Sequence, residues 1–143
     1  MTIGVKCYSA AARSDPRAEL EAARRRYPHL MLQGFRWSKR PNELLFRMIA
    51  EQTLQAGKTG NLLANKPEID FILRLAATTQ ISEAIAKMGT RKGEPFLVVV
   101  AGETKAARAL AGGAGWKTLK KYDLSKEELD MVENAALQNA RRG

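Results

Sequence analysis

The sequence predicts an α+β fold: a single mixed sheet of about four strands with helices packed on it, in one domain spanning residues 1–143. The run Phe96–Ala101 is continuously apolar and rich in valine, which is typical of a central strand covered on both faces. Residues Glu68–Leu75 place an apolar side chain at every second position, which indicates a strand with one buried face. Stripes of apolar residues at helical spacing surround both runs.

Three more segments have strand character. Thr2–Tyr8 is expected to form the first strand and Leu30–Trp37 the second. Trp116–Tyr122 is expected to form a short edge strand, where its lysines would discourage pairing with other molecules. The relative direction of the two central strands stays open, because the segment that connects them allows a crossover without requiring one. In the alternating run we expect four buried residues, Ile69, Phe71, Leu73 and Leu75.

Helix signals occupy the segments between these strands. Asp15-Pro16 joins a preferred N-cap residue to a proline at the first helical position, so a helix is expected there. A second helix is expected from Glu43 to Gly57. A third should end at Gly89 in a left-handed cap. Its buried stripe, with residues at i, i+3, i+4 and i+7, is expected to be Ile81, Ala84, Ile85 and Met88.

Two further helices are expected near the C-terminal end. One starts at Gly102–Thr104 and ends at the glycine cluster Gly112–Gly115, which follows a helix and lacks the spacing of a phosphate-binding loop. The other begins with a capping box, in which Ser125 and Glu128 each cap the backbone at the other residue. Its broad apolar face includes Leu129, Met131 and Val132.

Composition limits the class of protein. The chain has 143 residues, of which 45% are hydrophobic, so a domain with a real core is expected rather than disorder. It contains neither an apolar run of transmembrane length nor a signal-peptide core, so we expect a soluble cytoplasmic protein without a membrane partner. The net charge of +9 favours partners rich in phosphate, with nucleic acid first, although a solvated cationic face explains the charge equally well.

Catalytic chemistry is not evident in the sequence. Nucleophilic catalysis needs a Ser or Cys beside an oriented base, and Cys7 and His29 are far apart in the chain and outside any known motif. Glu68 and Asp70 have a spacing that could chelate a metal, but a solvated strand face is the better interpretation. We therefore expect a protein that is not an enzyme and has no cofactor and no metal site.

The middle of the chain resembles a known family. The string LRLAATTQISEAIAKMG, Leu73–Gly89, followed by a turn and an LVVV strand, resembles the smallest regulatory subunit of the KEOPS complex, the PRPK-binding-protein family of archaea and eukaryotes. The helix from Glu43 and the basic loop Lys58–Asn61 extend the resemblance to about the middle half of the chain. Its most specific residues are Gln80-Ile81 and Glu83-Ala84-Ile85.

One departure from the family pattern affects the expected site. Archaeal relatives usually have Gly-x-Arg before the glutamine, whereas this chain has Ala77-Thr78-Thr79. Whatever that arginine does in the family cannot be assigned to this chain.

The resemblance implies a non-catalytic subunit of the assembly that makes threonylcarbamoyl-adenosine on tRNA. In that family the subunit binds and stimulates a small atypical kinase/ATPase, and archaeal members also hold the single-stranded 3′ CCA end of tRNA. The alternative is an unrelated basic RNA-binding protein, such as a ribosome-associated factor. A small-molecule-binding enzyme ranks last.

Candidate contacts follow from the charge, the basic loop and the resemblance. Lys58 and Arg74 are expected to contact phosphates of the unpaired tRNA end, and Arg91 or Lys92 to replace the missing arginine at Thr79. Hydrogen bonds to sugars or base edges are expected from Asn61, Thr78, Thr79 and Gln80. The kinase subunit is expected to bind Leu129, Met131 and Val132, on a helix that packs partly on the sheet.

Overall fold

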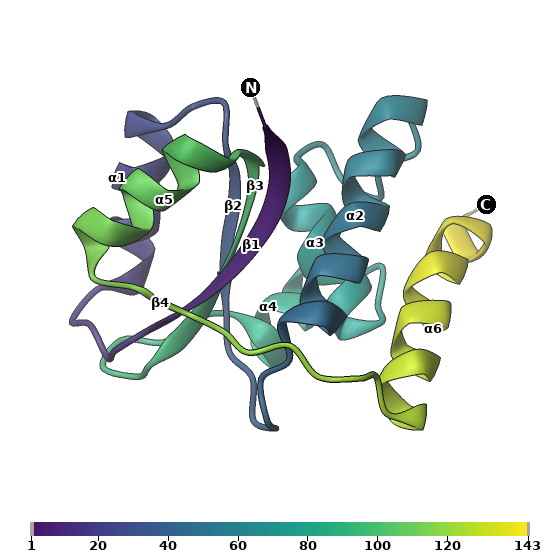
Figure 1. Cartoon of the computed structure of the whole chain (residues 1–143). Coiled ribbons are helices and arrows are strands. Elements are labelled where there is room, and N and C mark those ends of the chain that lie inside the picture. The colour runs from purple at the N-terminus through teal and green to yellow at the C-terminus, as the bar shows by residue number, and fades with distance from the viewer. Residues whose placement is uncertain (1, 143) are drawn as a thin grey trace.

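The computed structural model describes residues 2–142, and the side chains of residues 2–138. The described chain forms one sheet with helices on both faces (Figure 1). In chain order its elements are β1 (Ile3–Ala10), α1 (Pro16–Arg26), β2 (Met31–Phe35), α2 (Glu43–Thr59), α3 (Pro67–Ala76), α4 (Ile81–Met88), β3 (Phe96–Glu103), α5 (Thr104–Ala114), β4 (Lys117–Thr118) and α6 (Lys126–Arg142).

The four strands are arranged in the order β2-β3-β1-β4, and every pairing is antiparallel. β1 pairs with β3 along its whole length, from Ile3 opposite Glu103 to Ala10 opposite Phe96. β2 pairs with the other side of β3, so β1 and β2 run in the same direction with β3 between them. The α+β class and the four-stranded sheet are therefore confirmed, but the sheet is antiparallel rather than mixed.

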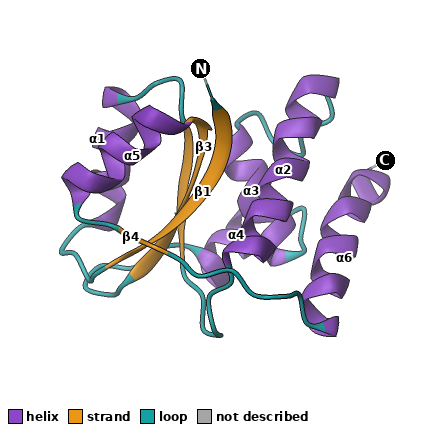
Figure 2. Cartoon of the chain, in the orientation of Figure 1, coloured by secondary structure: helices purple, strands orange, loops and turns teal. Residues whose placement is uncertain are grey.

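Helices cover the sheet unequally (Figures 1 and 2). α1 and α5 lie on one face; α2, α3 and α4 lie on the other, and α6 packs outside α2 and α3. On β3, Val98 and Val100 belong to the core under α1 and α5, whereas Leu97 and Val99 belong to the core under α2 and α3. The expected central strand with two buried faces is confirmed.

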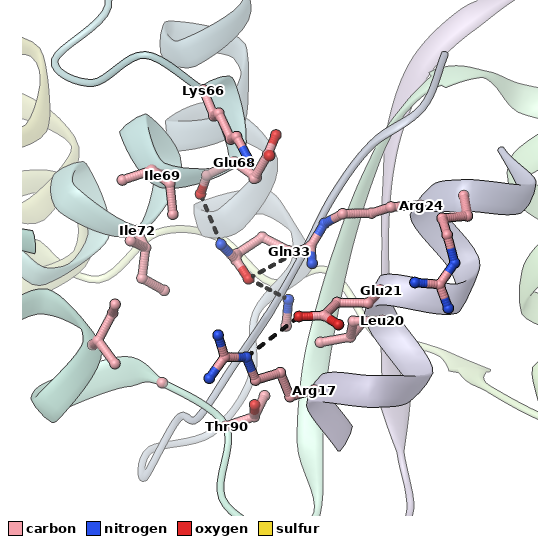
Figure 3. A pocket seen from close by; sticks show the side chains of 14 residues that line it. Arg17, Leu20, Glu21, Arg24, Gln33, Lys66, Glu68, Ile69, Ile72 and Thr90 are labelled. Atoms are coloured by element: carbon pink, nitrogen blue, oxygen red, sulfur yellow. Dashed lines mark hydrogen bonds and ion pairs between the residues drawn. The ribbon is translucent and has the colours of Figure 1, made fainter. Parts of the chain in front are cut away.

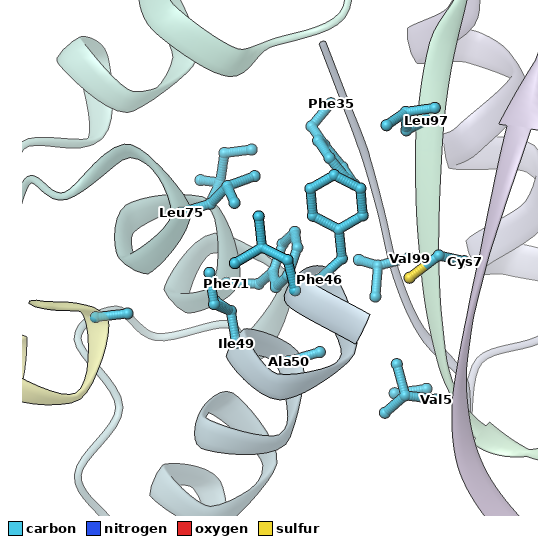
Figure 4. Close-up of a cluster of buried hydrophobic side chains, with 14 of the residues drawn as sticks. Val5, Cys7, Phe35, Phe46, Ile49, Ala50, Phe71, Leu75, Leu97 and Val99 are labelled. Atoms are coloured by element: carbon cyan, nitrogen blue, oxygen red, sulfur yellow. The ribbon is translucent and has the colours of Figure 1, made fainter. Parts of the chain in front are cut away.

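The larger core contains a cluster of aromatic rings (Figure 4). The ring of Phe35 on β2 meets Phe46 of α2 edge-on at 4.9 Å between centroids and Phe71 of α3 at 5.5 Å. All three side chains are fully buried, and edge-to-face contacts of this kind add to the stabilisation from burial. This cluster fixes α2 and α3 against the sheet.

The prediction of a strand at Glu68–Leu75 is wrong, because the segment is helix α3. Pro67 occupies the first helical turn, acids follow it, and the apolar residues also satisfy helical spacing. Phe71, Leu73 and Leu75 are buried as expected, and Ile69 is half-buried. α3 is buried on almost every side, so alternation and helical periodicity could not be distinguished within it.

The expected helix starts are confirmed at atomic detail. The Asp15 carboxylate accepts a hydrogen bond from Ala18 N at 3.1 Å, and Ser125 and Glu128 form the reciprocal capping box with bonds of 3.0 and 3.1 Å.

Two helix ends differ from expectation. α2 continues through Gly57 and ends at Gly60, which has the left-handed conformation with φ of 72°. Gly89 is extended, and it must be glycine because a Cβ there would lie 2.5 Å from the Ile85 carbonyl oxygen.

Candidate functional site

The junction between α3 and α4 holds three of the predicted tRNA contacts. Ala77 ends α3 in the left-handed conformation, with φ of 56°. The Thr78 hydroxyl accepts a hydrogen bond from Gln80 N at 3.1 Å and donates one to the Glu83 carboxylate at 3.1 Å. Thr78 therefore shapes the turn, whereas Thr79 and Gln80 are exposed.

This junction is also tied to α6. The Gln138 side chain, which is 1% exposed, donates a hydrogen bond from Nε2 to the Thr78 carbonyl oxygen at 2.9 Å. The turn that precedes α4 is thus held by a helix that is distant in sequence. A change in α6 near Gln138 would reach this turn directly.

Helix α4 presents apolar residues to solvent. We expected its stripe to be buried, and that expectation is wrong for two of four residues: Ile81 is 47% exposed and Ile85 52% exposed. Ala84 is fully buried and Met88 half-buried, because only this side of the short helix faces α3. Ile81 and Ile85 are one turn apart, so they form an exposed apolar pair immediately after Thr79 and Gln80.

Arg74 is not available as a phosphate contact, and its prediction as one is wrong. Its side chain is 1% exposed, and it pairs with the fully buried Asp70 through Nε–Oδ1 at 2.6 Å and Nη2–Oδ2 at 3.2 Å. Its Nη1 donates to the Ala135 carbonyl oxygen of α6 at 3.0 Å. Asp70 also accepts from the Thr53 hydroxyl at 2.6 Å and from Leu63 N at 2.9 Å. Arg74 therefore joins α3 to α2 and α6 inside the protein.

The remaining predicted contacts do not form one cluster. Lys58 lies exposed in the last turn of α2, and Asn61 follows the Gly60 cap and donates from Nδ2 to the Thr59 hydroxyl at 3.0 Å. Among the described residues no hydrogen bond joins either side chain to the Thr78–Gln80 turn. Arg91 and Lys92 lie beyond the other end of α4, on a loop whose Gly93 N–H donates to the Arg13 carbonyl oxygen at 2.7 Å. The length of α4 separates them from Thr79.

The predicted partner face lies on α6, which packs on α2 and α3 instead of the sheet. The sheet is already covered there, so that part of the expectation is wrong. Leu129 is 47% exposed, whereas Met131 and Val132 are half-buried against the larger core. The sequence did not single out Leu137, which is 53% exposed two turns beyond Leu129. A cavity of about 430 Å³ lies between α2 and α6, with Val132 and Arg74 among its lining residues.

A larger hollow follows the free edge of β2, between α1 on one side and α3 and α4 on the other (Figure 3). Its volume is about 630 Å³. We call it the β2 groove; its lining includes Arg17, Arg24, Arg25, Gln33, Lys66 and Ile85. The sequence did not predict the groove. The run Arg24-Arg25-Arg26 was compatible with a phosphate contact, but three basic residues at a helix C-terminus were better explained by the helix dipole.

Burial removes the one thiol from nucleophilic chemistry. Cys7 is fully buried, and this burial, with a smaller effect of the Glu43 carboxylate, raises the pKa of the thiol. In the part of the chain that the structure describes, no group of three His, Cys, Asp or Glu side chains is placed to hold a metal ion. No helix there has both the length and the apolar character needed to cross a membrane.

No model of a known protein family matches the chain, and no curated protein is significantly similar to it.

Proposed function

We propose that this chain is a non-catalytic subunit of a KEOPS-type assembly, which binds a small atypical kinase/ATPase subunit and helps to recruit tRNA through its 3′ CCA end. The main support for the proposal is the exposure of the residues that carry the resemblance. Of its most specific residues, Gln80, Ile81, Glu83 and Ile85 are exposed and only Ala84 is buried. A motif made chiefly of surface residues fits a binding role better than a role in folding.

The backbone at Ala77 gives independent support to the alignment of the motif. Archaeal relatives usually carry glycine at this position, and the structure places Ala77 in the left-handed region, where glycine has no steric cost. A residue in this conformation is needed to turn the chain from α3 into α4. The left-handed backbone at Ala77 is therefore compatible with a glycine at this position of the family pattern.

For the tRNA end, the proposal places the unpaired nucleotides along α4. Thr79 and Gln80 offer hydrogen bonds to sugars or base edges, and Ile81 and Ile85 offer the apolar surface on which bases pack. Arg74 has no part in this path because it is buried in its pair with Asp70. The net charge of +9 supplies long-range attraction to the phosphates.

For the protein partner, the proposal assigns the exposed side of α6. Leu129 and Leu137 leave two large apolar side chains in solvent on a helix whose other side is packed on α2 and α3. Apolar residues clustered on one exposed helix face are typical of a protein-binding surface. Met131 and Val132 support this surface from beneath, since both are partly buried against the core.

The partner prediction can be tested by co-purification with the kinase subunit. The double variant Leu129→Glu with Leu137→Glu should lose the complex, because two charges would be buried at the interface, while the isolated protein stays folded. The matched control is Ile3→Glu, which changes an even more exposed residue, 62% in solvent, at the start of β1. It should keep the complex. Retention of the complex by the double variant would reject the α6 assignment, and capture of ribosomal particles in place of a kinase would favour the ribosome-associated alternative.

The tRNA prediction can be tested by comparing whole tRNA with tRNA that lacks its last three nucleotides. Binding should fall on trimming, and Gln80→Ala with Ile81→Ala should produce a similar fall, because the double variant removes a hydrogen-bonding side chain and part of the apolar surface along α4. Thr118→Ala with Lys117→Ala, on the far edge strand β4, provides the control. Equal binding of whole and trimmed tRNA would leave only non-specific electrostatic attraction and would refute this site.

A further inference from the structure

The β2 groove has features of a binding site, and of its lining residues the proposed function uses only Ile85. It lies at the free edge of the sheet, and α1 forms one wall while α3 and α4 form the other (Figure 3). Its volume of about 630 Å³ is within the usual range for small-molecule sites. The charged and apolar side chains of its walls indicate the chemical class of ligand that it would bind.

Positive charge dominates the walls. Four basic side chains line the groove, Arg17, Arg24, Arg25 and Lys66, against two carboxylates, Glu21 and Glu68. Arg17 pairs with Glu21 at 3.4 Å. Among the described residues, Arg25 and Lys66 make no ion pair within 4.0 Å, and they reach the groove from opposite walls. Their charges are therefore available to an anionic ligand.

The strand edge in the groove is already closed by hydrogen bonds within the protein. Arg24 donates from Nε and Nη2 to the Leu32 carbonyl oxygen at 3.2 and 3.0 Å. Gln33 Oε1 accepts from Gly34 N at 3.1 Å, and the Arg36 N–H donates to the Met88 carbonyl oxygen at 2.7 Å. An extended peptide would have to displace these bonds before it could add to the sheet. The occupant is therefore recognised through side chains.

Gln33 is the residue that holds the two walls together. Its Oε1 also accepts from Arg24 Nη2 at 3.2 Å, and its Nε2 donates to the Glu68 carbonyl oxygen at 3.0 Å (Figure 3). Its amide thus links α1, β2 and α3 and has little capacity left for a ligand. This bridge makes the groove a preformed feature of the fold, with Arg24 fixed at its centre.

The rest of the groove surface is apolar. Leu20 and Ile72 contribute buried side chains, Ile69 is half-buried, and Ile85 is exposed at the rim. Gly34 allows Leu20 and Thr90 to pack closely on β2, since a Cβ there would lie 2.5 Å from Leu20 Cδ1 and 3.0 Å from Thr90 Cγ2. A ligand that fits must therefore combine anionic groups with an apolar part.

We propose that the β2 groove binds a free phosphorylated nucleoside. Arg25 and Lys66 contact its phosphates from the two walls, with Arg24 between them. The base and sugar pack on Ile69 and Ile85. Arginine and lysine are suited to phosphate oxygens, and isoleucine side chains give the base an apolar support. This inference does not depend on the assignment of the chain to a KEOPS-type assembly, because its phosphate contacts, Arg24, Arg25 and Lys66, have no part in the α6 surface or in the proposed tRNA path along α4. Ile85 is the one residue that the groove shares with that path.

The proposal is tested by titrating the full chain with ADP in a calorimeter, with pyrophosphate and adenosine as separate probes. The double variant Arg25→Glu with Lys66→Glu should weaken ADP binding at least tenfold. The matched control, Arg26→Glu with Lys105→Glu, changes the net charge equally at two exposed positions; Arg26 stacks on Tyr27 and neither residue lines the groove. It should weaken ADP binding less than threefold.

A third variant separates the apolar contact from the phosphate contact. Ile85→Ser should weaken ADP binding several-fold and leave pyrophosphate binding unchanged, because only the nucleoside part contacts Ile85. Equal losses in the two charge-reversed variants would show non-specific attraction and overturn the proposal. No ADP binding at millimolar concentration would also overturn it, as would binding of a short single-stranded RNA in this groove in the absence of ADP binding.

Discussion

The two faces of the sheet are built differently, and they differ in buried polar groups and in exposed apolar side chains. The face under α1 and α5 has a core made only of apolar residues. The opposite face has two layers of helices, with a buried ionic pair between them. Four of the five large exposed hydrophobic residues in the described part of the chain lie on this second side: Ile81, Ile85, Leu129 and Leu137. We call the face under α1 and α5 the simple face and the face under α2, α3, α4 and α6 the layered face; the layered face carries most of the large exposed apolar side chains.

The second helix layer explains why a charged pair is buried. α3 lies between the sheet and α6, so its polar residues Asp70 and Arg74 are buried and have no side that faces water. Asp70 and Arg74, four residues apart, satisfy each other and the neighbouring groups on α2 and α6. This pair specifies how the helices fit together, although burial of ions is itself costly.

The largest effect is expected from breaking that pair. Arg74→Ala should lower the free energy of unfolding by about 3–5 kcal/mol, because it leaves the buried Asp70 carboxylate without its cation. Chemical denaturation measures the change. Lys87→Ala provides the control, since it removes an exposed pair with Glu83 at the same spacing and should cost about 0.3–0.5 kcal/mol. A loss below 1 kcal/mol for Arg74→Ala would mean that the layered face does not depend on this pair.

Core truncations compare the two faces directly. Leu73→Ala, on the layered face, should cost about 2–5 kcal/mol and lie in the upper half of that range, because the side chain is fully buried between two layers. Leu110→Ala, on α5, should lie in the lower half, because the leucine is 8% exposed and its site can relax toward solvent. Thermal and denaturant unfolding of both variants give the comparison, and equal losses would contradict it.

A smaller effect of opposite sign is expected at the turn that leads into α4. Ala77→Gly should raise the free energy of unfolding by about 1 kcal/mol, because it relieves the left-handed backbone at φ of 56°. Ala76→Gly, one residue earlier and within α3, is the control and should destabilise the protein. Destabilisation by both variants would show that the backbone at Ala77 is not strained.

The smallest expected change in stability is at the start of α5 on the simple face. Glu103 accepts hydrogen bonds from Lys105 N and Ala106 N at 3.0 and 2.7 Å, and these bonds lower the pKa of its carboxyl. Its stabilisation is therefore fully present above the ordinary glutamate pKa and is lost as the pH falls through the lowered folded-state pKa. The gap in stability between the wild type and Glu103→Gln should close over that acidic range.

The sequence alone determined the features that depend on neighbouring residues. Asp15-Pro16 and the Ser125–Glu128 box set helix starts because a cap acts within three residues of itself. The run of valines determined the central strand, because an unbroken β-branched stretch is stable only where both faces are covered. From these signals the α+β class followed directly.

Only the tertiary structure decided which surfaces are covered. Three outcomes depend on α6 and the sheet, which are distant in sequence. They are the helical structure of residues 68–75, the pairing of Arg74 with Asp70 in place of a phosphate, and the exposure of Ile81. Periodicity shows that a segment has an apolar side, but a segment that is buried on every side satisfies both periods. The β2 groove is likewise formed by side chains from α1, β2, α3 and α4. The sequence of any one of these segments does not indicate which other segments lie beside it.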